Sequence, residues 1–198
     1  MYTSIRDYQV DPSNVAEIAR RAESGFVPII SSVPGFVVYT LVDCGNGRVI
    51  TTSFFDDQAG AEESVKKASS WVKENLGPLI PNPPKVTSGE VVVRKVTQGG
   101  TAGYGVMRRF QVDVSQIGEV TRRVQEELVP ILSSVPGFVS YAAIDAGNGT
   151  AVTLSSFQDQ ASFEAAVRKA ADWSQQMSSL LPTPPEVTTG KILFRKAR

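Results

Sequence analysis

The chain has 198 residues, of which 41% are hydrophobic and 20% charged, so it can bury a core in one domain or in two small ones. Its 20 basic and 20 acidic residues balance to a formal net charge of zero, which disfavours nucleic-acid binding because neutralising phosphates needs a basic excess. No apolar run approaches the roughly 18 residues of a membrane span, and the N-terminal segment lacks the regions of a signal peptide. We therefore expect a cytoplasmic protein with no nucleic-acid or membrane partner.

The sequence contains no histidine and a single cysteine. Histidine is the commonest general base near neutral pH and the commonest metal ligand. Its absence excludes Ser-His-Asp and Cys-His catalysis, a histidine-bound zinc site, and haem held by a histidine. The composition therefore predicts a protein that uses no metal and no tightly bound cofactor.

The first predicted strand is the alternating segment over residues 4–10. Asp11-Pro12 follows, a pair typical of a helix N-terminus. The next apolar residues recur at helical spacing: Val15, Ile18, Ala19, Ala22 and Phe26. Pro28 is expected to kink this helix or to end its regular part. Val33-Pro34-Gly35-Phe36 suits a type II turn, which leads into a second strand over residues 36–43.

The next element is a hairpin with Asn46-Gly47 as its predicted type I′ turn, because this turn needs positive φ at both central residues. The return strand covers residues 49–55, and Asp56 or Asp57 caps a second helix. The inward stripe of that helix consists of Ala61, Val65, Ala68 and Val72. The proline-rich PNPP segment leads to a last strand over residues 90–96, so the predicted order is βαββαβ.

The whole pattern then occurs a second time. The segment SSVPGFV covers residues 31–37 and again residues 133–139, and an offset of 102 also matches Trp71 with Trp173. A repeat of about 90 residues exceeds the usual solenoid period and indicates a duplicated domain. The TQGGTAGYG segment between the copies has four glycines in nine residues, which is typical of a flexible linker. The predicted organisation is a first repeat, a linker and a second repeat, at residues 1–97, 98–105 and 106–198.

Each copy has the element order of a ferredoxin-like unit, a four-stranded antiparallel sheet with helices on one face. The second strand is apolar on both sides, with Tyr39 and Leu41 on one side and Val38 and Val42 on the other. Such a strand needs cover on both faces, which two sheets placed face to face provide. We therefore predict an α+β protein in which tandem ferredoxin-like βαββαβ repeats form a fused α/β barrel within one chain, with further oligomerisation left open.

With this order, the PGF segment before the second strand, the hairpin and the acidic cap before an alanine-rich helix, the chain resembles the dimeric α/β-barrel superfamily. Within it, the chain resembles the antibiotic-biosynthesis-monooxygenase-like (ABM-like) proteins. The resemblance covers both copies and implies cofactor-free oxygenation of polycyclic aromatic substrates, haem degradation, chlorite dismutation or muconolactone isomerisation. Members with known chemistry often carry a tryptophan late in the third strand and a histidine in the second helix. Here Phe55 and Phe157 occupy those strand ends, and no histidine exists.

Three side chains are candidates for catalysis: Tyr39, Tyr141 and Arg108. The tyrosines can donate a hydrogen bond to a bound carbonyl or phenol, or serve as core residues with satisfied hydroxyls. Arg108 can stabilise an enolate-like charge, or pair with an acid across strands. Trp173 can form a stacking wall for a ligand, or anchor a helix.

Differences between the copies predict where a pocket lies. With Asn46-Gly47 as the turn, Tyr141 is expected opposite Ser156. On the other face, Val38, Thr40, Cys44 and Val49 of the first copy become Ser140, Ala142, Ala146 and Ala151 of the second. Nothing obvious refills this space, so we expect a ligand pocket in the C-terminal half near Tyr141, Ser140, Ala142 and Ser155. The alternative is that neighbouring groups close the space.

Two functions follow from the sequence. The first is a cofactor-independent, monooxygenase-like enzyme that orients a small aromatic substrate, assists its deprotonation and lets the carbanion react with dioxygen. The alternative is a non-catalytic barrel that binds a small molecule or a partner. Without an evident base, the sequence does not decide between them.

Overall fold

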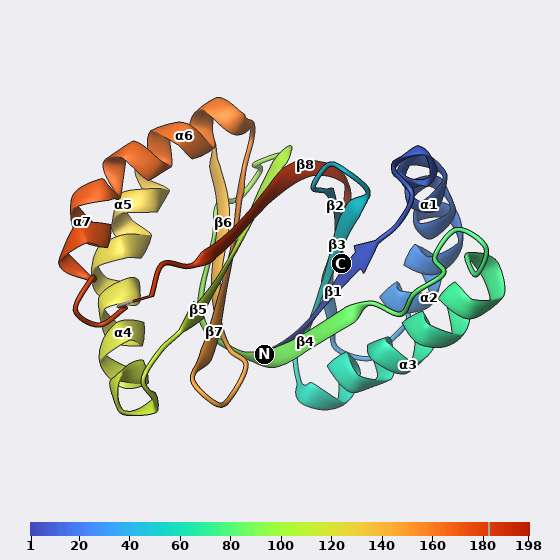
Figure 1. The fold of residues 1–198 in the computed structure, drawn as a ribbon, viewed down its shortest axis with the longest axis horizontal. Coiled ribbons are helices and arrows are strands. Elements are labelled where there is room, and N and C mark those ends of the chain that lie inside the picture. Colours follow the sequence, from blue (N-terminus) through green and yellow to red (C-terminus); the bar gives the residue numbers. More distant parts are fainter. Residues whose placement is uncertain (182) are drawn as a thin grey trace. The chain divides into compact units, whose positions relative to one another are not determined.

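The computed structural model describes residues 1–181 and 183–198, and the chain divides into two compact units (Figure 1). Unit 1 comprises Met1–Glu90 and Gly190–Arg198, and unit 2 comprises Val91–Thr189. The elements of unit 1 are β1 (Tyr2–Gln9), η1 (Pro12–Asn14), α1 (Val15–Arg21), η2 (Ala22–Phe26), α2 (Val27–Ser31), β2 (Phe36–Asp43), β3 (Arg48–Phe55) and α3 (Gln58–Asn75). The elements of unit 2 are β5 (Tyr104–Gln111), η3 (Val114–Gln116), α4 (Ile117–Arg123), η4 (Val124–Leu128), α5 (Val129–Ser133), β6 (Phe138–Asp145), β7 (Thr150–Phe157), α6 (Gln160–Lys169) and α7 (Ala171–Gln176).

Two long strands belong partly to each unit: β4 (Lys85–Val96) and β8 (Glu186–Ala197). All eight strands are hydrogen bonded in the order β1-β3-β2-β8-β5-β7-β6-β4, which closes a barrel. This order confirms the predicted α+β class, with two ferredoxin-like halves fused in one chain. The predicted domain limits at residues 97 and 106 stay a prediction, since the compact units divide inside β4 and β8.

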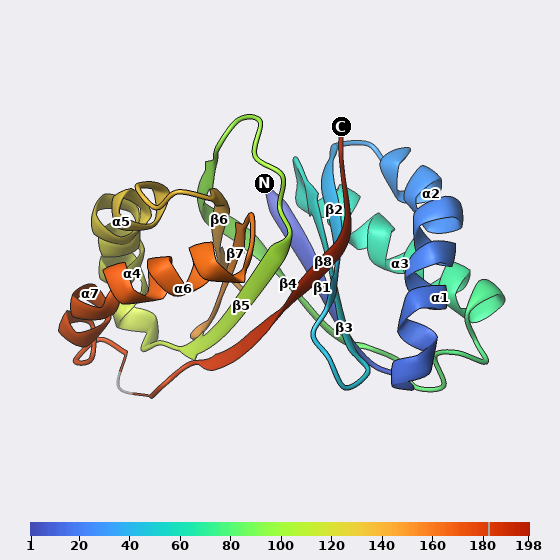
Figure 2. The same ribbon diagram turned by 90° about the horizontal axis from the view of Figure 1, so that it is seen from above.

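Within each unit, the helices cover one face of the sheet (Figures 1 and 2). The first predicted helix is interrupted in both copies by a π-helical turn, η2 in unit 1 and η4 in unit 2. Pro28 and Pro130 directly follow these turns, in the first turn of α2 and of α5, so the N–H that proline lacks falls where the helical hydrogen-bond pattern changes. In the described parts of the chain, every helix is too short or too polar to span a membrane.

The predicted type II turn is supported by Gly35, whose φ of 73° only glycine adopts without strain. The predicted hairpin register was wrong by one residue. Gly45, Asn46 and Gly47 all have positive φ, and Cys44 and Arg48 close a three-residue loop instead of a two-residue one. A side chain at Gly47 would collide with the carbonyl oxygen of Val10, so glycine is required there.

The three-residue loop decides which side chains share a face. Tyr141 pairs with Ser155, and not with Ser156 as predicted. The equivalent pair in unit 1 is Tyr39 with Ser53. Because neighbouring residues of a strand point to opposite faces, the shift by one residue moves Ser155 to the helix-covered face and Ser156 to the other.

Candidate ligand-binding site

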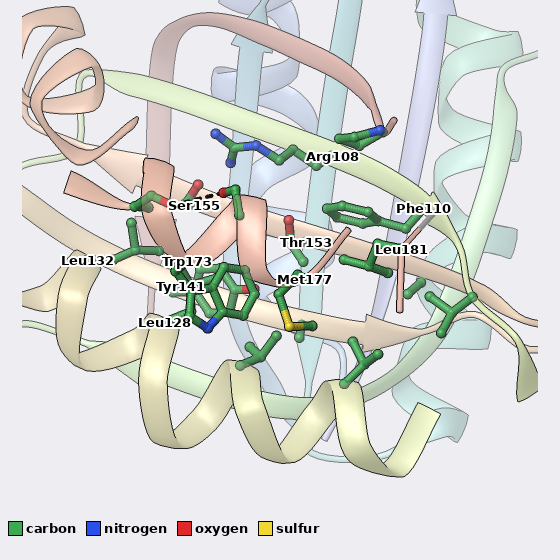
Figure 3. Close-up of a pocket in the computed structure, with 18 of the residues that line it drawn as sticks. Arg108, Phe110, Leu128, Leu132, Tyr141, Thr153, Ser155, Trp173, Met177 and Leu181 are labelled. Carbon is green, nitrogen blue, oxygen red and sulfur yellow. Dashed lines mark hydrogen bonds between the residues drawn. The ribbon is translucent and has the colours of Figure 1, made fainter. Parts of the chain in front are cut away.

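Unit 2 contains a cavity of about 610 Å³ between its sheet and its helices (Figure 3). Ligand sites of small molecules commonly have volumes of about 300–1,000 Å³. The walls are mainly apolar and come from β5, β6 and β7 on the sheet side and from α4, η4, α6 and α7 on the helix side. In Figure 3, the Arg108 guanidinium points away from Phe110, and Leu181 lies near Phe110 at the other end of the cavity.

The corresponding place in unit 1 is nearly filled, with a cavity of only about 20 Å³. There, the Phe26 ring lies 5.6 Å from the Tyr39 ring and 5.4 Å from the Trp71 ring, between centroids. Four side chains that fill this core are smaller in unit 2: Phe26, Leu41, Val49 and Val72 correspond to Leu128, Ala143, Ala151 and Ser174. The cavity therefore results from the loss of side-chain volume on an otherwise repeated frame.

Four polar side chains lie on the sheet floor of the cavity: Arg108, Thr153, Ser155 and Tyr141. They come from three adjacent strands, because Arg108 of β5 pairs with Thr153 of β7, and Ser155 of β7 pairs with Tyr141 of β6. Directly opposed residues on one face are about 4.5–5.5 Å apart at Cβ, so these groups form a single polar patch.

The hydroxyls of Tyr141 and Ser155 are buried and make no hydrogen bond to any residue that the structure describes. A buried polar group without a partner is costly, so both hydroxyls favour a ligand that supplies one. Burial raises the pKa of Tyr141 well above its usual range, and the charge of Arg108 opposes this only in part. Tyr141 is therefore a hydrogen-bond donor near neutral pH and not a base.

Arg108 has no hydrogen bond or ion pair within the described part of the chain, and its Cζ lies 5.7 Å from the centroid of the Phe163 ring. Burial lowers the pKa of its guanidinium, but arginine starts so high that the group remains charged. The ring holds the cation by its face and leaves the N–H donors uncommitted. The cavity therefore presents a positive charge with available donors to an otherwise apolar space.

Trp173 closes one side of the cavity. Its Nε1 donates a hydrogen bond to Oε2 of Glu127, 2.9 Å away. Gly25 stands at the equivalent place in unit 1, where a Cβ atom would lie 3.0 Å from the Trp71 ring. Glu127 therefore holds the polar edge of Trp173, while the apolar ring surface lines the cavity.

Residues 103–171, from β5 to the end of α6, match the family model for antibiotic biosynthesis monooxygenase. Unit 2 therefore contains a segment, called the ABM domain below, that is similar to antibiotic biosynthesis monooxygenases (ABM). No curated protein matches the chain in sequence.

Solved structures share the fold over nearly the whole chain. A candidate monooxygenase from Fusobacterium nucleatum superposes with a TM-score of 0.81 at 10% identity, covering 100% of this chain and 94% of that one. A candidate monooxygenase from Lactobacillus acidophilus has a TM-score of 0.80 at 12% identity, with 99% and 95% covered. An anthrone oxidase-like protein has a TM-score of 0.67 at 13% identity, with 99% and 92% covered. At these identities the likeness shows a common fold.

Four predicted site residues meet in the cavity of the ABM domain: Arg108, Tyr141, Ser155 and Trp173. Tyr39 lies in unit 1, where its ring packs against those of Phe26 and Phe194. Ser140 and Ala142 point to the opposite face of β6 and are not among the residues that line this cavity. The Ser140 hydroxyl instead lies 2.6 Å from the Ser156 hydroxyl. The role of all these residues in binding or catalysis stays a prediction.

Thr153 and Ala166, which sequence reasoning missed, also line the cavity, and so does Phe163, which the sequence suggested only as a larger core residue in place of Ala61. A signal for the last two was present. Arg6 and Arg108 are equivalent, whereas Ala61 and Ser64 of the first copy become Phe163 and Ala166 of the second. An arginine that persists while its surroundings change indicates that the two copies use it differently.

The Ser64 hydroxyl is expected to stabilise unit 1. Arg6 is 2% exposed, and its Nη2 donates to Ser64 Oγ at 3.0 Å. Ser64→Ala leaves that donor buried and unpaired, which should lower the free energy of unfolding by about 1–3 kcal/mol. Urea denaturation measures the change, and Ser69→Ala on the exposed side of α3 is the control. Equal stability of the two variants would show that Arg6 does not depend on Ser64.

Proposed function

We propose that the ABM domain of unit 2 binds a largely apolar molecule that carries an anionic oxygen, and oxygenates it without a cofactor. The observation that carries this proposal is the uncommitted Arg108 guanidinium beside the unpaired Tyr141 and Ser155 hydroxyls in an apolar cavity. The family match and the fold shared with candidate monooxygenases and an anthrone oxidase-like protein support this chemistry.

The reaction needs a substrate that is itself the reductant. A suitable substrate has an aromatic CH₂ group conjugated to a carbonyl, so that loss of a proton gives an enolate with negative charge on oxygen and reactivity on carbon. Arg108 stabilises the oxygen, with Tyr141 and Ser155 as further donors. The carbon transfers electrons to dioxygen and forms a C–O bond, giving a peroxide that loses water. The balance is CH₂ plus O₂ to C=O plus H₂O.

Among the described residues that line the cavity, Asp145 is the only carboxylate, and its Oδ1 accepts a hydrogen bond from the Gly147 N–H at 2.8 Å. Tyr141 has a raised pKa and does not remove a proton near neutral pH. The substrate therefore ionises to water as it binds, and Arg108 selects the anion. The rate should rise with pH through the pKa of the substrate and not through that of a protein base.

The use of Asp145 as the acceptor of the Gly147 N–H and the raised pKa of Tyr141 also favour a second function, in which the ABM domain binds such an anion without converting it. The two functions share the same binding site and differ only in whether dioxygen is consumed. A turnover assay separates them.

The test uses dihydroxyanthrone as the probe, with oxygen uptake and the absorbance of the anthraquinone product as readouts. The wild type should exceed the rate in buffer, and Arg108→Gln should lower the catalysed rate by about 100-fold, the usual effect of losing an oxyanion donor. Arg109→Gln, on the opposite face of β5, is the matched control and should retain activity. Binding without any catalysed uptake would establish the second function, and an Arg108→Gln variant as active as the wild type would remove Arg108 from the mechanism.

A further inference from the structure

We infer that the acidic oxygen of the ligand binds over Ala166, at the place that the Ser64 hydroxyl occupies in unit 1. This inference rests on the binding part of the proposed function. It adds where the acidic group of the ligand, its head group, lies, and which residues leave Arg108 free to bind it. Ala166 and Phe163 are then specificity residues that keep Arg108 free for a ligand.

Unit 1 contains the same arrangement with a protein group in place of the ligand. Arg6 Nη1 donates to Ser53 Oγ at 3.1 Å, and Nη2 donates to Ser64 Oγ at 3.0 Å. Ser64 Oγ in turn lies 2.7 Å from the carbonyl oxygen of Ala61 and donates to it. Two hydroxyls from the same unit thereby pair with both terminal nitrogens of the arginine, while Nε stays unpaired, and the space beside it is nearly filled.

Unit 2 has the same arginine and serine on its strands but lacks the helix hydroxyl that pairs with the arginine in unit 1. Ser155 still stands where Ser53 does, but Ala166 replaces Ser64 and removes the oxygen that would accept from the arginine. Ser155 Oγ and the guanidinium of Arg108 are no longer bonded to each other. An oxygen from outside the chain can therefore take the place of the Ser64 hydroxyl and accept from Arg108.

Phe163 replaces Ala61 and draws the guanidinium towards its ring. The ring is itself held by Tyr104, at 5.5 Å and stacked, and by Phe157, at 5.9 Å, both between centroids. A cation over an aromatic face is stabilised without the use of its N–H groups. Phe163 therefore holds Arg108 without using its N–H groups, and because Ser155 Oγ is not hydrogen bonded to the guanidinium, both remain available to one head group.

This geometry specifies a class of ligand. The guanidinium fork and the two hydroxyls favour a head group with two or more neighbouring oxygens, such as a carboxylate, a sulfonate or an enolate beside a second oxygen. The rest of the ligand must be apolar, because Phe110, Met177 and Leu181 line the far end of the cavity in Figure 3. The ligand therefore lies with its acidic edge at Arg108 and its apolar part towards these residues.

The test compares two fluorescent probes with the same aromatic skeleton, anilinonaphthalene sulfonate and the neutral phenylnaphthylamine. Ala166→Ser restores the hydroxyl of unit 1 and should satisfy Arg108 internally. The affinity for the sulfonate should fall at least 10-fold, while the affinity for the neutral probe stays within about twofold of the wild type. Ala166→Cys adds an atom of at least the same size with weak hydrogen bonding, and should keep most of the sulfonate affinity. Ser64→Ala in unit 1 should leave both affinities unchanged.

A second variant covers the case that Ala166→Ser folds poorly. Phe163→Ala restores the Ala61 of unit 1 and should let Arg108 bond to Ser155, again with loss of sulfonate affinity. The inference would be wrong if Ala166→Ser left the sulfonate affinity unchanged, or if it lowered the affinities for both probes equally. It would also be wrong if Ala166→Cys lowered the sulfonate affinity as much as Ala166→Ser does. A wild type that binds neither probe would overturn it together with the proposed binding. If only the oxygen-uptake assay fails, the inference about the head group is unaffected, because the two probe-binding titrations require no turnover.

Discussion

Refilling the cavity of unit 2 with the side chains of unit 1 is expected to abolish ligand binding while the fold becomes more stable. The variant is Leu128→Phe with Ala143→Leu and Ala151→Val, which restores the residues at the equivalent positions of unit 1. The two alanine substitutions alone add five carbon atoms to an apolar space. Burial of a methylene contributes about 0.8 kcal/mol, so the free energy of unfolding should rise by about 2–4 kcal/mol. Binding of the neutral phenylnaphthylamine should fall by at least 100-fold.

The converse experiment removes part of that volume from unit 1, at the position equivalent to Ala143. Leu41 is 1% exposed, so Leu41→Ala should lower the free energy of unfolding by about 3–5 kcal/mol. Urea denaturation gives both stability changes, and fluorescence titration gives the affinities. If the refilled variant still bound the probe as the wild type does, the ligand would bind elsewhere on the protein.

Residues 1–97 expressed alone should not form a stable monomer. In the full chain, one edge of β2 is hydrogen bonded to β8, with Val38 opposite Ala197 and Asp43 opposite Lys191. The fragment lacks β8, so an apolar strand is left with unpaired N–H and C=O groups, which favours pairing with another copy. Size-exclusion chromatography with light scattering should show dimers or aggregates.

Two further samples test the cause. A peptide of residues 186–198 added in trans should shift the fragment towards a monomeric complex. Cleavage of the full-length protein at a protease site placed at Gly99, in an exposed turn, should leave the two pieces together. A monodisperse, cooperatively unfolding monomer of residues 1–97 would contradict the expectation.

The fold was predictable because its signals are local and occur twice. Asp57 caps α3 through a hydrogen bond to the Gly60 N–H, and Gly35 forms the turn that precedes β2. Both features follow from residue types at fixed spacing. The repeat then predicted that a second sheet of the same kind packs against the first, because the second strand is apolar on both faces and one copy covers only one of them.

The candidate site was predictable only in part, because it depends on the register of one hairpin. Asn46-Gly47 favours a two-residue turn in isolation, but Gly45 also adopts positive φ, and the loop has three residues. This difference reversed the faces of Ser155 and Ser156, so the predicted pocket combined Ser155 with Ser140 and Ala142 of the opposite face. Propensity rules score the turn residues and not the contact of the loop with Val10, which is formed only in the folded unit.

The presence of two copies in one chain has a consequence for how such a protein can change. In an assembly of two identical subunits, every mutation occurs twice, so a substitution that enlarges one cavity enlarges both and lowers stability twice. Once the genes for the two copies are joined, each copy accumulates its own mutations. Here one copy has Leu41 and Ser64, and the other has Ala143 and Ala166 at the equivalent positions. Selection on ligand choice can therefore act on the second half. The closed core of the first half meanwhile keeps the whole chain stable, although the cavity lowers the stability of the second half.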